Sequence, residues 1–269
     1  MPDAVSPSPA QAPVWRFVAA GAVGGLLSGM FGVGGGIVMV PLLMWLGRLD
    51  QRRASATSLA AIIPTALVGA VAYGANGHLA VWTAVLVALG ATGGAWAGSR
   101  ILRRISLTVL SWAFVGLLAA VALSMVFYTP QRGPAAPLTV LTGLALVALG
   151  LAMGLASGLF GIGGGVIAVP ALMALFGAGD LVARGTSLLV MVPSAVTGSV
   201  TNWRGGLVRL REGLAAGAAA AATSFGGTAL AALVSPRLGN ILFAALLAVS
   251  AVQLALRAAR RRPRPRGGQ

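Results

Sequence analysis

The sequence predicts an all-α membrane protein with several transmembrane helices, arranged as two related halves. Of its 269 residues, 58% are hydrophobic and only 9% are charged. Apolar runs of about 18 residues or more recur along the chain, and about 20 apolar residues are enough for a helix to cross a bilayer. A soluble domain of this size would carry far more charge on its surface. A glycine-rich stretch that occurs twice is the third observation, and it indicates an internal duplication.

The apolar residues form eight blocks, separated by polar or turn-forming residues. The blocks cover residues 14–47, 54–75, 79–99, 106–128, 138–176, 185–203, 213–234 and 238–257. A segment with three prolines, residues 130–137, lies at the midpoint of the chain. We therefore expect a disordered lead over residues 1–13, a first repeat over 14–128, a linker over 129–137, a second repeat over 138–256 and a basic cytoplasmic tail over 257–269.

Two of the blocks are interrupted by the same glycine motif. Its copies cover residues 28–41 and 157–170, and each has an initial Ser, a Phe-Gly-x-Gly-Gly-Gly core and a final Pro. Glycine costs roughly 1 kcal/mol per helical site relative to alanine, so these clusters predict breaks in the helices. Unwound backbone at membrane depth is tolerated only where protein buries it or where it lines a wet cavity. Both copies are therefore the candidate functional centre.

The repeat extends well beyond the glycine motif. Moving the chain by 129 positions superposes both motifs, places Thr-Ser-Leu at residues 57–59 on the same tripeptide at 186–188, and places Pro64 on Pro193. This register over one offset predicts a duplication. Each half is expected to begin with a glycine-broken helix, which three transmembrane helices follow, the first of them containing a proline.

The arginines indicate how the blocks cross the membrane. If all eight blocks cross once, the nineteen arginines divide almost evenly, eight against eleven. If both glycine-broken blocks instead enter the membrane and return, sixteen arginines share the side of the termini and only Arg132, Arg184 and Arg237 lie opposite, in loops. Basic residues gather on the cytoplasmic side, which favours re-entrant blocks and cytoplasmic termini. The halves are then inverted repeats, the common arrangement in secondary transporters.

The second broken block leaves one alternative open. Its final part, residues 166–176, is about 17 Å long as a helix, which is short of the roughly 30 Å hydrocarbon core. The part before the break, residues 138–158, is long enough to cross. A net crossing by this block therefore stays open beside the re-entrant hypothesis.

The combination of two glycine breaks, each followed by Pro, by Thr-Ser-Leu and by a proline-containing helix, resembles the sulfite exporter TauE/SafE family, anion permeases for sulfur-containing compounds. The resemblance covers about residues 16–257. It implies a multi-pass protein of the bacterial inner (plasma) membrane that moves small anions such as sulfite, thiosulfate or organosulfonates like sulfoacetate. The family's motif residues fall on Gly32, Gly34, Gly35, Gly36, Pro41, Thr57, Ser58 and Pro64, and on Gly161, Gly163, Gly164, Gly165, Pro170, Thr186, Ser187 and Pro193.

An anion inside a membrane needs hydrogen-bond donors, and the glycine breaks can supply them. Unwound backbone exposes N–H groups, and a helix that begins after the break points its positive end toward the gap. Nearby hydroxyls are further donors. The expected substrate-binding residues are Ser28, Gly32, Gly34, Gly35, Gly36, Thr57, Ser58, Ser157, Gly161, Gly163, Gly164, Gly165, Thr186 and Ser187. Helix-breaking or structural roles are expected for Pro41, Pro64, Pro170 and Pro193.

Each of these assignments has a structural alternative. Glycines in membrane helices commonly serve close helix packing, which is the favoured role for Gly90, Gly94 and Gly98. Ser and Thr in apolar helices usually bond their own backbone carbonyls. For the glycine motifs we favour binding, because packing needs spaced small residues rather than a run of three.

Other kinds of chemistry find little support in the sequence. The chain has no Cys and one His, and its four acidic residues lie outside the deep parts of the apolar blocks. Proton and metal-cation carriers place carboxylates or histidines at membrane depth, and neither a nucleotide-binding loop nor a catalytic pair is present. We expect no enzyme, no metal, no cofactor and no nucleic-acid partner; the expected partners are a small anion and the lipid bilayer.

The sequence thus predicts a secondary transporter of small sulfur-containing anions that works by alternating access. Two hypotheses from other classes stay open: a non-transporting membrane scaffold for a neighbouring enzyme, and a passive anion channel. The anion, the direction of transport, the coupling ion and the oligomeric state are not fixed by the sequence.

Overall fold

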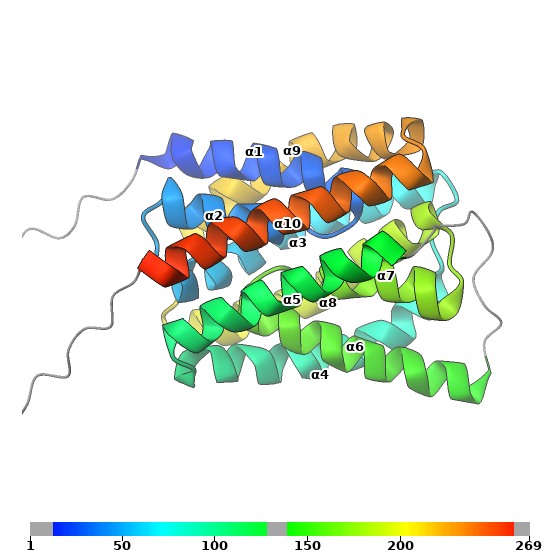
Figure 1. Ribbon diagram of the computed structural model, residues 1–269, viewed down its shortest axis with the longest axis horizontal. Helices are drawn as coiled ribbons and strands as arrows, with labels where there is room; N and C mark the ends of the chain where they lie inside the picture. Colours follow the sequence, from blue (N-terminus) through cyan, green and yellow to red (C-terminus); the bar gives the residue numbers. More distant parts are fainter. Residues whose placement is uncertain (1–12, 128–138, 261–269) are drawn as a thin grey trace, which may run out of the picture.

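The computed structural model describes residues 13–127 and 139–260, and within these ranges it consists of ten α-helices without a strand (Figure 1). The helices are α1 (Val14–Phe31), α2 (Gly36–Trp45), α3 (Gln51–Ala75), α4 (Val81–Arg104), α5 (Leu107–Phe127), α6 (Val140–Phe160), α7 (Gly165–Phe176), α8 (Asp180–Arg204), α9 (Leu210–Leu233) and α10 (Pro236–Arg260). The lead over residues 1–12, the linker and the last part of the tail lie outside the described ranges. Helix α10 continues four residues past the expected end of the second repeat.

Eight of the helices described are long and apolar enough to cross a membrane. The two exceptions are α2 and α7, with 10 and 12 residues. At 1.5 Å per residue they extend about 15 and 18 Å, roughly half of a hydrocarbon core. The expectation of an all-α, polytopic membrane protein is confirmed.

Each short helix turns back along the helix before it. The Arg16 side chain, at the start of α1, donates a hydrogen bond to the carbonyl of Leu46, just past the end of α2, at 3.3 Å. The backbone of Gly35 packs against that of Gly24 in the same hairpin. In the second half, a Cβ atom at Gly164 would lie 2.7 Å from the Met153 carbonyl oxygen. The first and second glycine breaks are thus the tips of two helical hairpins, α1–α2 and α6–α7.

The two halves interlock through glycine-lined helix contacts. Helix α1 packs closely along α9, and α6 packs closely along α4. The glycines of α4 at positions 90, 94 and 98 touch the backbone of α6, so the packing role expected for them is confirmed. Spaced small residues let two helix backbones approach closely, which is how helices associate in a bilayer. Each half therefore contacts the other over the length of two helix pairs.

Helices α3 and α8 occupy the middle of the bundle. They are the most buried of the long helices and contact each other, whereas α5 and α10 are the least buried and pack together on the outside (Figure 1). The start of α1 and the end of α10 lie on the same side of the bundle, at the left of Figure 1. The glycine hairpins flank the central pair, so any site at the breaks is walled by α3 and α8.

The four prolines lie inside helices and end none of them, so the helix-breaking alternative does not apply, whereas the predicted proline-containing helices after each break are present in α3 and α8. Pro41 and Pro170 are in α2 and α7, and Pro64 and Pro193 are in α3 and α8. A buried helix can continue through a proline where tertiary packing offsets the lost hydrogen bond and neighbouring groups satisfy the freed carbonyl. The breaks themselves are made by glycine alone.

Candidate functional site

The two glycine motifs meet inside the bundle. A Cβ atom at Gly36 would lie 2.6 Å from the carbonyl oxygen of Gly161, and one at Gly165 would lie 2.6 Å from the Cα atom of Val33. Real Cβ atoms do not approach backbone so closely, so only glycine fits at these positions. Two stretches separated by 129 residues in the sequence thus form one closely packed centre.

The backbone at the breaks requires glycine for a second reason. Three glycines of each motif adopt the left-handed conformation, which costs a residue with a Cβ atom roughly 1–2 kcal/mol. Their φ angles are 70°, 73° and 70° at Gly32, Gly34 and Gly35, and 72°, 76° and 88° at Gly161, Gly163 and Gly164.

The centre is closely symmetric. Gly34 and Gly163 correspond to each other, and both lie against the same two side chains, Ile62 and Met191. These two residues also correspond, since they are 129 positions apart. The Sδ atom of Met191 would lie 2.6 Å from a Cβ atom at Gly34 and 3.0 Å from one at Gly163. The side chains of Ile62 and Met191 therefore fill the space next to both breaks.

Two helix N-termini open toward this centre. Helix α2 begins at Gly36 and α7 at Gly165, with Gly35 and Gly164 as the preceding N-cap residues. Among the described residues, no side chain caps either helix start. The first N–H groups of a helix have no partner within the helix and carry partial positive charge. Two uncapped helix starts that face a shared centre are suited to hold an anion.

Four of the expected serines lie around the breaks. The carbonyl of Ser28 accepts the N–H of Gly32 at 2.8 Å, and that of Ser157 accepts the N–H of Gly161 at 2.9 Å. Ser187 lies one turn along α8 from Arg184, whose backbone packs against Gly32. Ser58 holds the equivalent position on α3 for the second break. All four side chains are fully buried.

The hydroxyls of Ser28, Ser58, Ser157 and Ser187 have no hydrogen-bond partner within the part of the chain that the structure describes. Buried polar groups in proteins are nearly always paired, so each exception calls for an explanation. A ligand or water at the breaks would provide one. The four serines come in two corresponding pairs, which repeats the symmetry of the glycines.

The expected threonines are placed differently. The hydroxyl oxygen of Thr57 accepts the backbone N–H of Arg209 at 3.5 Å, and that of Thr186 accepts the backbone N–H of Ala80 at 3.0 Å. Arg209 and Ala80 are the N-cap residues of α9 and α4. Each threonine therefore joins its own central helix to the loop before a helix of the other half.

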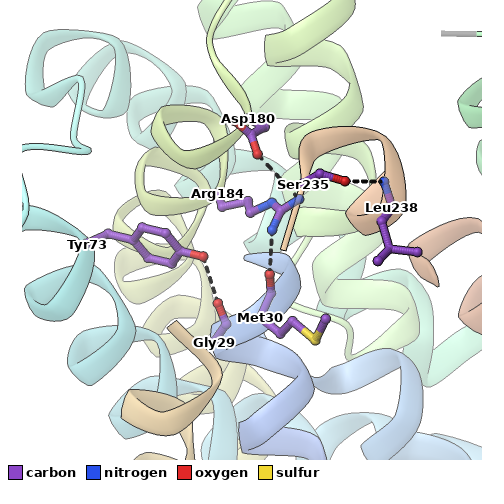
Figure 2. A network of polar contacts seen from close by, with 7 residues as sticks. All are labelled: Gly29, Met30, Tyr73, Asp180, Arg184, Ser235 and Leu238. Carbon is purple, nitrogen blue, oxygen red and sulfur yellow. Dashed lines mark hydrogen bonds and ion pairs between the residues drawn. The ribbon is translucent and has the colours of Figure 1, made fainter. Parts of the chain in front are cut away.

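A charged cluster lies at the end of α1 and consists of Tyr73, Asp180 and Arg184 (Figure 2). Nη1 of Arg184 donates to the Met30 carbonyl at 2.8 Å, and the Tyr73 hydroxyl donates to the Gly29 carbonyl at 2.8 Å. Nη2 of Arg184 lies 3.8 Å from a carboxylate oxygen of Asp180. The Arg184 and Asp180 side chains are only 6% and 1% exposed. The first break is thus bordered by a buried ion pair.

The corresponding positions of the other half hold a neutral cluster of Gln51, Ser55 and Asn202. Gln51 accepts a hydrogen bond from the Ser111 hydroxyl, and Nδ2 of Asn202 donates to the Ser99 hydroxyl at 3.4 Å. All three side chains are fully buried. The second glycine break therefore has the same backbone and the same depth of burial as the first, without a charge.

Sequence reasoning missed the charged cluster. Arg184 was expected in a loop outside the bundle, and Asp180 outside the apolar blocks, but α8 begins at Asp180 and packing against α1 buries both. A comparison of the halves could have revealed them. At an offset of 129, Asp180 falls on Gln51 and Arg184 on Ser55, two polar positions at which only the second half is charged.

Of the described residues, no three His, Cys, Asp or Glu side chains are grouped as a metal site would need.

Comparisons with known proteins identify the kind of protein. The chain is 30% identical over 221 residues to the "Probable membrane transporter protein YunE" of Bacillus subtilis (strain 168), covering 74% of this chain and 81% of that protein. It is 33% identical over 181 residues to a "Probable membrane transporter protein" of Xylella fastidiosa (strain 9a5c), covering 65% and 68%. No solved structure matches the chain.

The family model for the sulfite exporter TauE/SafE matches residues 2–125 and 146–269. These two segments contain both glycine breaks and nearly all of the residues of the candidate membrane-spanning helices, and the two relatives are named as probable membrane transporter proteins. The chain therefore belongs to the sulfite exporter TauE/SafE family of membrane transporters.

Proposed function

We propose that this protein is a secondary transporter of small sulfur-containing anions, such as sulfite, thiosulfate or organosulfonates, in the bacterial inner membrane. One observation carries the proposal: at the two glycine breaks lie two helix starts without a side-chain cap and four buried serine hydroxyls that have no partner among the described residues. Helix N-termini attract anions without a metal or a cofactor. The description of the family supports the substrate class.

Within this proposal, the substrate lies at the two breaks. Backbone N–H groups of the two motifs and the four serine hydroxyls donate to its oxygens, and glycine lets the backbone approach them closely. Thr57 and Thr186 contribute indirectly to the proposed binding site. Their hydroxyls accept hydrogen bonds from neighbouring loops and so hold these loops next to α3 and α8. The side chains of Ile62 and Met191 fill the space next to Gly34 and Gly163, and they have to change conformation when an anion binds there. No catalytic step is proposed, because the family is a class of permeases.

We further propose inverted halves with both termini in the cytoplasm. The matching elements at an offset of 129 support this, as does the shared side of the start of α1 and the end of α10. Sixteen of the nineteen arginines fall on that side in the re-entrant topology. Basic residues prefer the cytoplasmic face.

Alternating access then has to move parts that cross the boundary between the repeats. The backbone contacts of α1 with α9 and of α4 with α6 leave no space between the halves along these helices. Backbones in such contact move together more readily than apart. The pairs α1–α9 and α4–α6 are therefore the proposed rigid bodies, and they rock about the central helices α3 and α8.

The test is anion flux in proteoliposomes. Radiolabelled sulfite, thiosulfate, sulfoacetate and sulfate are compared, with nickel as a cation control, in the wild type, in Gly164→Leu and in Ser157→Ala/Ser187→Ala. Gly116→Leu is the matched control, because a Cβ atom at Gly116 meets nothing within 4 Å. The serine variant is included because it removes donors without adding volume, so its folding is not in question.

We expect saturable flux of one or more of these anions in the wild type and in the Gly116 variant, and its loss in the other two variants. If the serine variant had the same flux as the wild type, the anion would not bind at the glycine breaks. Absence of flux in folded wild type would favour a scaffold. Flux that does not saturate and shows no counterflow would indicate a channel.

A further inference from the structure

The charged cluster places a full positive charge at the end of α1, directly before the first glycine break. A Cβ atom at Gly32 would lie 2.5 Å from the Cα atom of Arg184, so this arginine begins directly against the first break. Its guanidinium reaches the Met30 carbonyl in the last turn of α1. The unpaired hydroxyls of Ser28 and Ser187 belong to the same turns of α1 and α8. Charge and donors thus lie together at one break.

We propose that Arg184 is the residue that recognises the charge of the transported anion, and that Asp180 holds its guanidinium when no anion is bound. The inference rests on the proposed function and adds to it a charge-recognising residue at one end of the pathway. The ligand class is a small anion with two or more oxygens, which a planar guanidinium binds with parallel N–H groups.

The ion pair is too loose to use the donors of Arg184 fully. Nη2 lies 3.8 Å from the carboxylate oxygen of Asp180, beyond the 2.7–2.9 Å typical of a charge-assisted hydrogen bond. A guanidinium has five N–H donors; in the described part of the chain one of them donates to the Met30 carbonyl, and the guanidinium also interacts with the Tyr73 hydroxyl. The cluster therefore retains donor capacity and a counter-charge that an anion can replace.

Helix capping alone does not account for the cluster. Arg184 and Tyr73 do bond the final carbonyls of α1, where a cation is favoured by the helix dipole. The second hairpin, however, has the same left-handed glycines and the same return, with Ser55 and Asn202 in the equivalent positions. A buried ion pair is costly to desolvate, and neutral groups often replace it without loss of stability. The fold forms one break without a charge, so the charge at the other needs another role.

Helix α10 leaves room for the guanidinium. A Cβ atom at Gly239 would lie 2.7 Å from Nη2 of Arg184. The residue 129 positions earlier is Leu110, which is fully buried in α5, next to Ser111, the partner of Gln51 in the neutral cluster. The large and small residues are thus exchanged between the two clusters. The charged cluster combines the large Arg184 with the small Gly239, and the neutral cluster combines the small Ser55 with the large Leu110. This places the guanidinium beside the first turn of α10, whose positive helix end adds to the attraction for an anion.

The neutral cluster also provides the variants that test the proposal. Asp180→Gln/Arg184→Ser gives two of the three positions of the charged cluster the side chains of the neutral cluster and removes both charges at once. Asp180→Asn removes only the competing carboxylate. Arg237→Ser is the control, because Arg237 is an exposed arginine in the adjacent first turn of α10. The KM for sulfite and thiosulfate uptake is measured in proteoliposomes for each variant, and folding is followed by thermal unfolding.

We expect Asp180→Asn to lower the KM by about tenfold, because the carboxylate no longer competes, and the double variant to raise it by about tenfold or more. Arg237→Ser should leave it unchanged. A folded double variant with the KM of the wild type would overturn the inference while leaving the proposed function intact. A higher KM in Asp180→Asn would likewise overturn it, since a purely structural ion pair predicts that direction. Wild type without saturable flux would instead refute the proposed function, and with it this inference.

Discussion

The two glycine hairpins are nearly identical in backbone and differ in the polar groups around them. In α1–α2 and α6–α7, the left-handed glycines, the uncapped helix starts and the unpaired serines all occur in pairs. At the end of the first hairpin, however, lies the buried pair Asp180–Arg184, and at the end of the second lie Gln51 and Ser55. The paired features are what the fold and the proposed binding site require. The charge is the one large difference between the ends.

This difference separates stability from recognition. Since the second hairpin forms with neutral side chains, the first does not need its ion pair to form. Effects that the glycines share should therefore appear equally in both halves, and effects of charge in one half only. Substitutions at corresponding positions test that separation directly.

The largest effect is expected at the contact between the motifs. Gly165→Leu places a side chain against Met191 and 2.6 Å or less from the Val33 backbone, so we expect a loss of stability of more than about 3 kcal/mol or no folded protein. Gly36→Leu should behave alike, because it meets the backbone of the second motif. Size-exclusion profiles and thermal unfolding in detergent measure this, with Gly116→Leu as control. A mild effect at one of the two sites would break the equivalence of the hairpins.

A smaller effect, confined to one half, is expected at Gly239. Gly239→Leu pushes a side chain into the Arg184 guanidinium, which should cost about 1–3 kcal/mol. Adding Arg184→Ser recreates the Ser55–Leu110 combination and should restore most of that stability. Thermal unfolding of the two single variants and the double variant gives the coupling energy. Additive losses would mean that the guanidinium does not occupy the space next to Gly239.

The threonines predict a graded difference between the halves. Thr186→Val leaves the partly buried N–H of Ala80 without its partner at 3.0 Å, so we expect a loss of about 1 kcal/mol in the free energy of unfolding. Thr57→Val breaks a longer contact of 3.5 Å with Arg209 and should cost less. Thermal unfolding of both variants gives the order. The reverse order would show that these loops are not held by the threonine hydroxyls.

The smallest effect on stability is expected for the unpaired serines. Ser28→Ala and Ser187→Ala each remove a buried hydroxyl that has no partner in the described chain, so the unfolding free energy should change by less than about 0.5 kcal/mol or rise. Anion flux should nevertheless fall. Thr92→Ala is the matched control, because that hydroxyl bonds its own helix carbonyl at 2.8 Å and should leave flux unchanged. A marked loss of stability in the serine variants would reveal partners that the hydroxyls hold within the protein.

Hydropathy and the spacing of the glycines were enough to predict the helices, the duplication and the breaks. Hydrophobic runs fix where a chain crosses a bilayer, because the cost of polar groups in hydrocarbon depends on composition along a short stretch. Five glycines in eight residues likewise end a helix whatever surrounds them. These are local properties, so the all-α membrane class and the special status of residues 32–36 and 161–165 could be predicted.

Which side chains contact each other could not be predicted in this way, because it depends on how the helices pack. Pro41 was expected to have a helix-breaking or structural role, and it lies within α2, because packing from other helices outweighs the local preference. The hydroxyls of Thr57 and Thr186 accept hydrogen bonds from loops of the opposite half. Arg184 is buried by its contacts with α1 and α10, and Asp180 is buried beside it. Burial of a polar side chain depends on partners more than a hundred residues away, which neither composition nor periodicity reports. For that reason the duplicated breaks could be predicted from the sequence, whereas the single charge beside one of them required the fold.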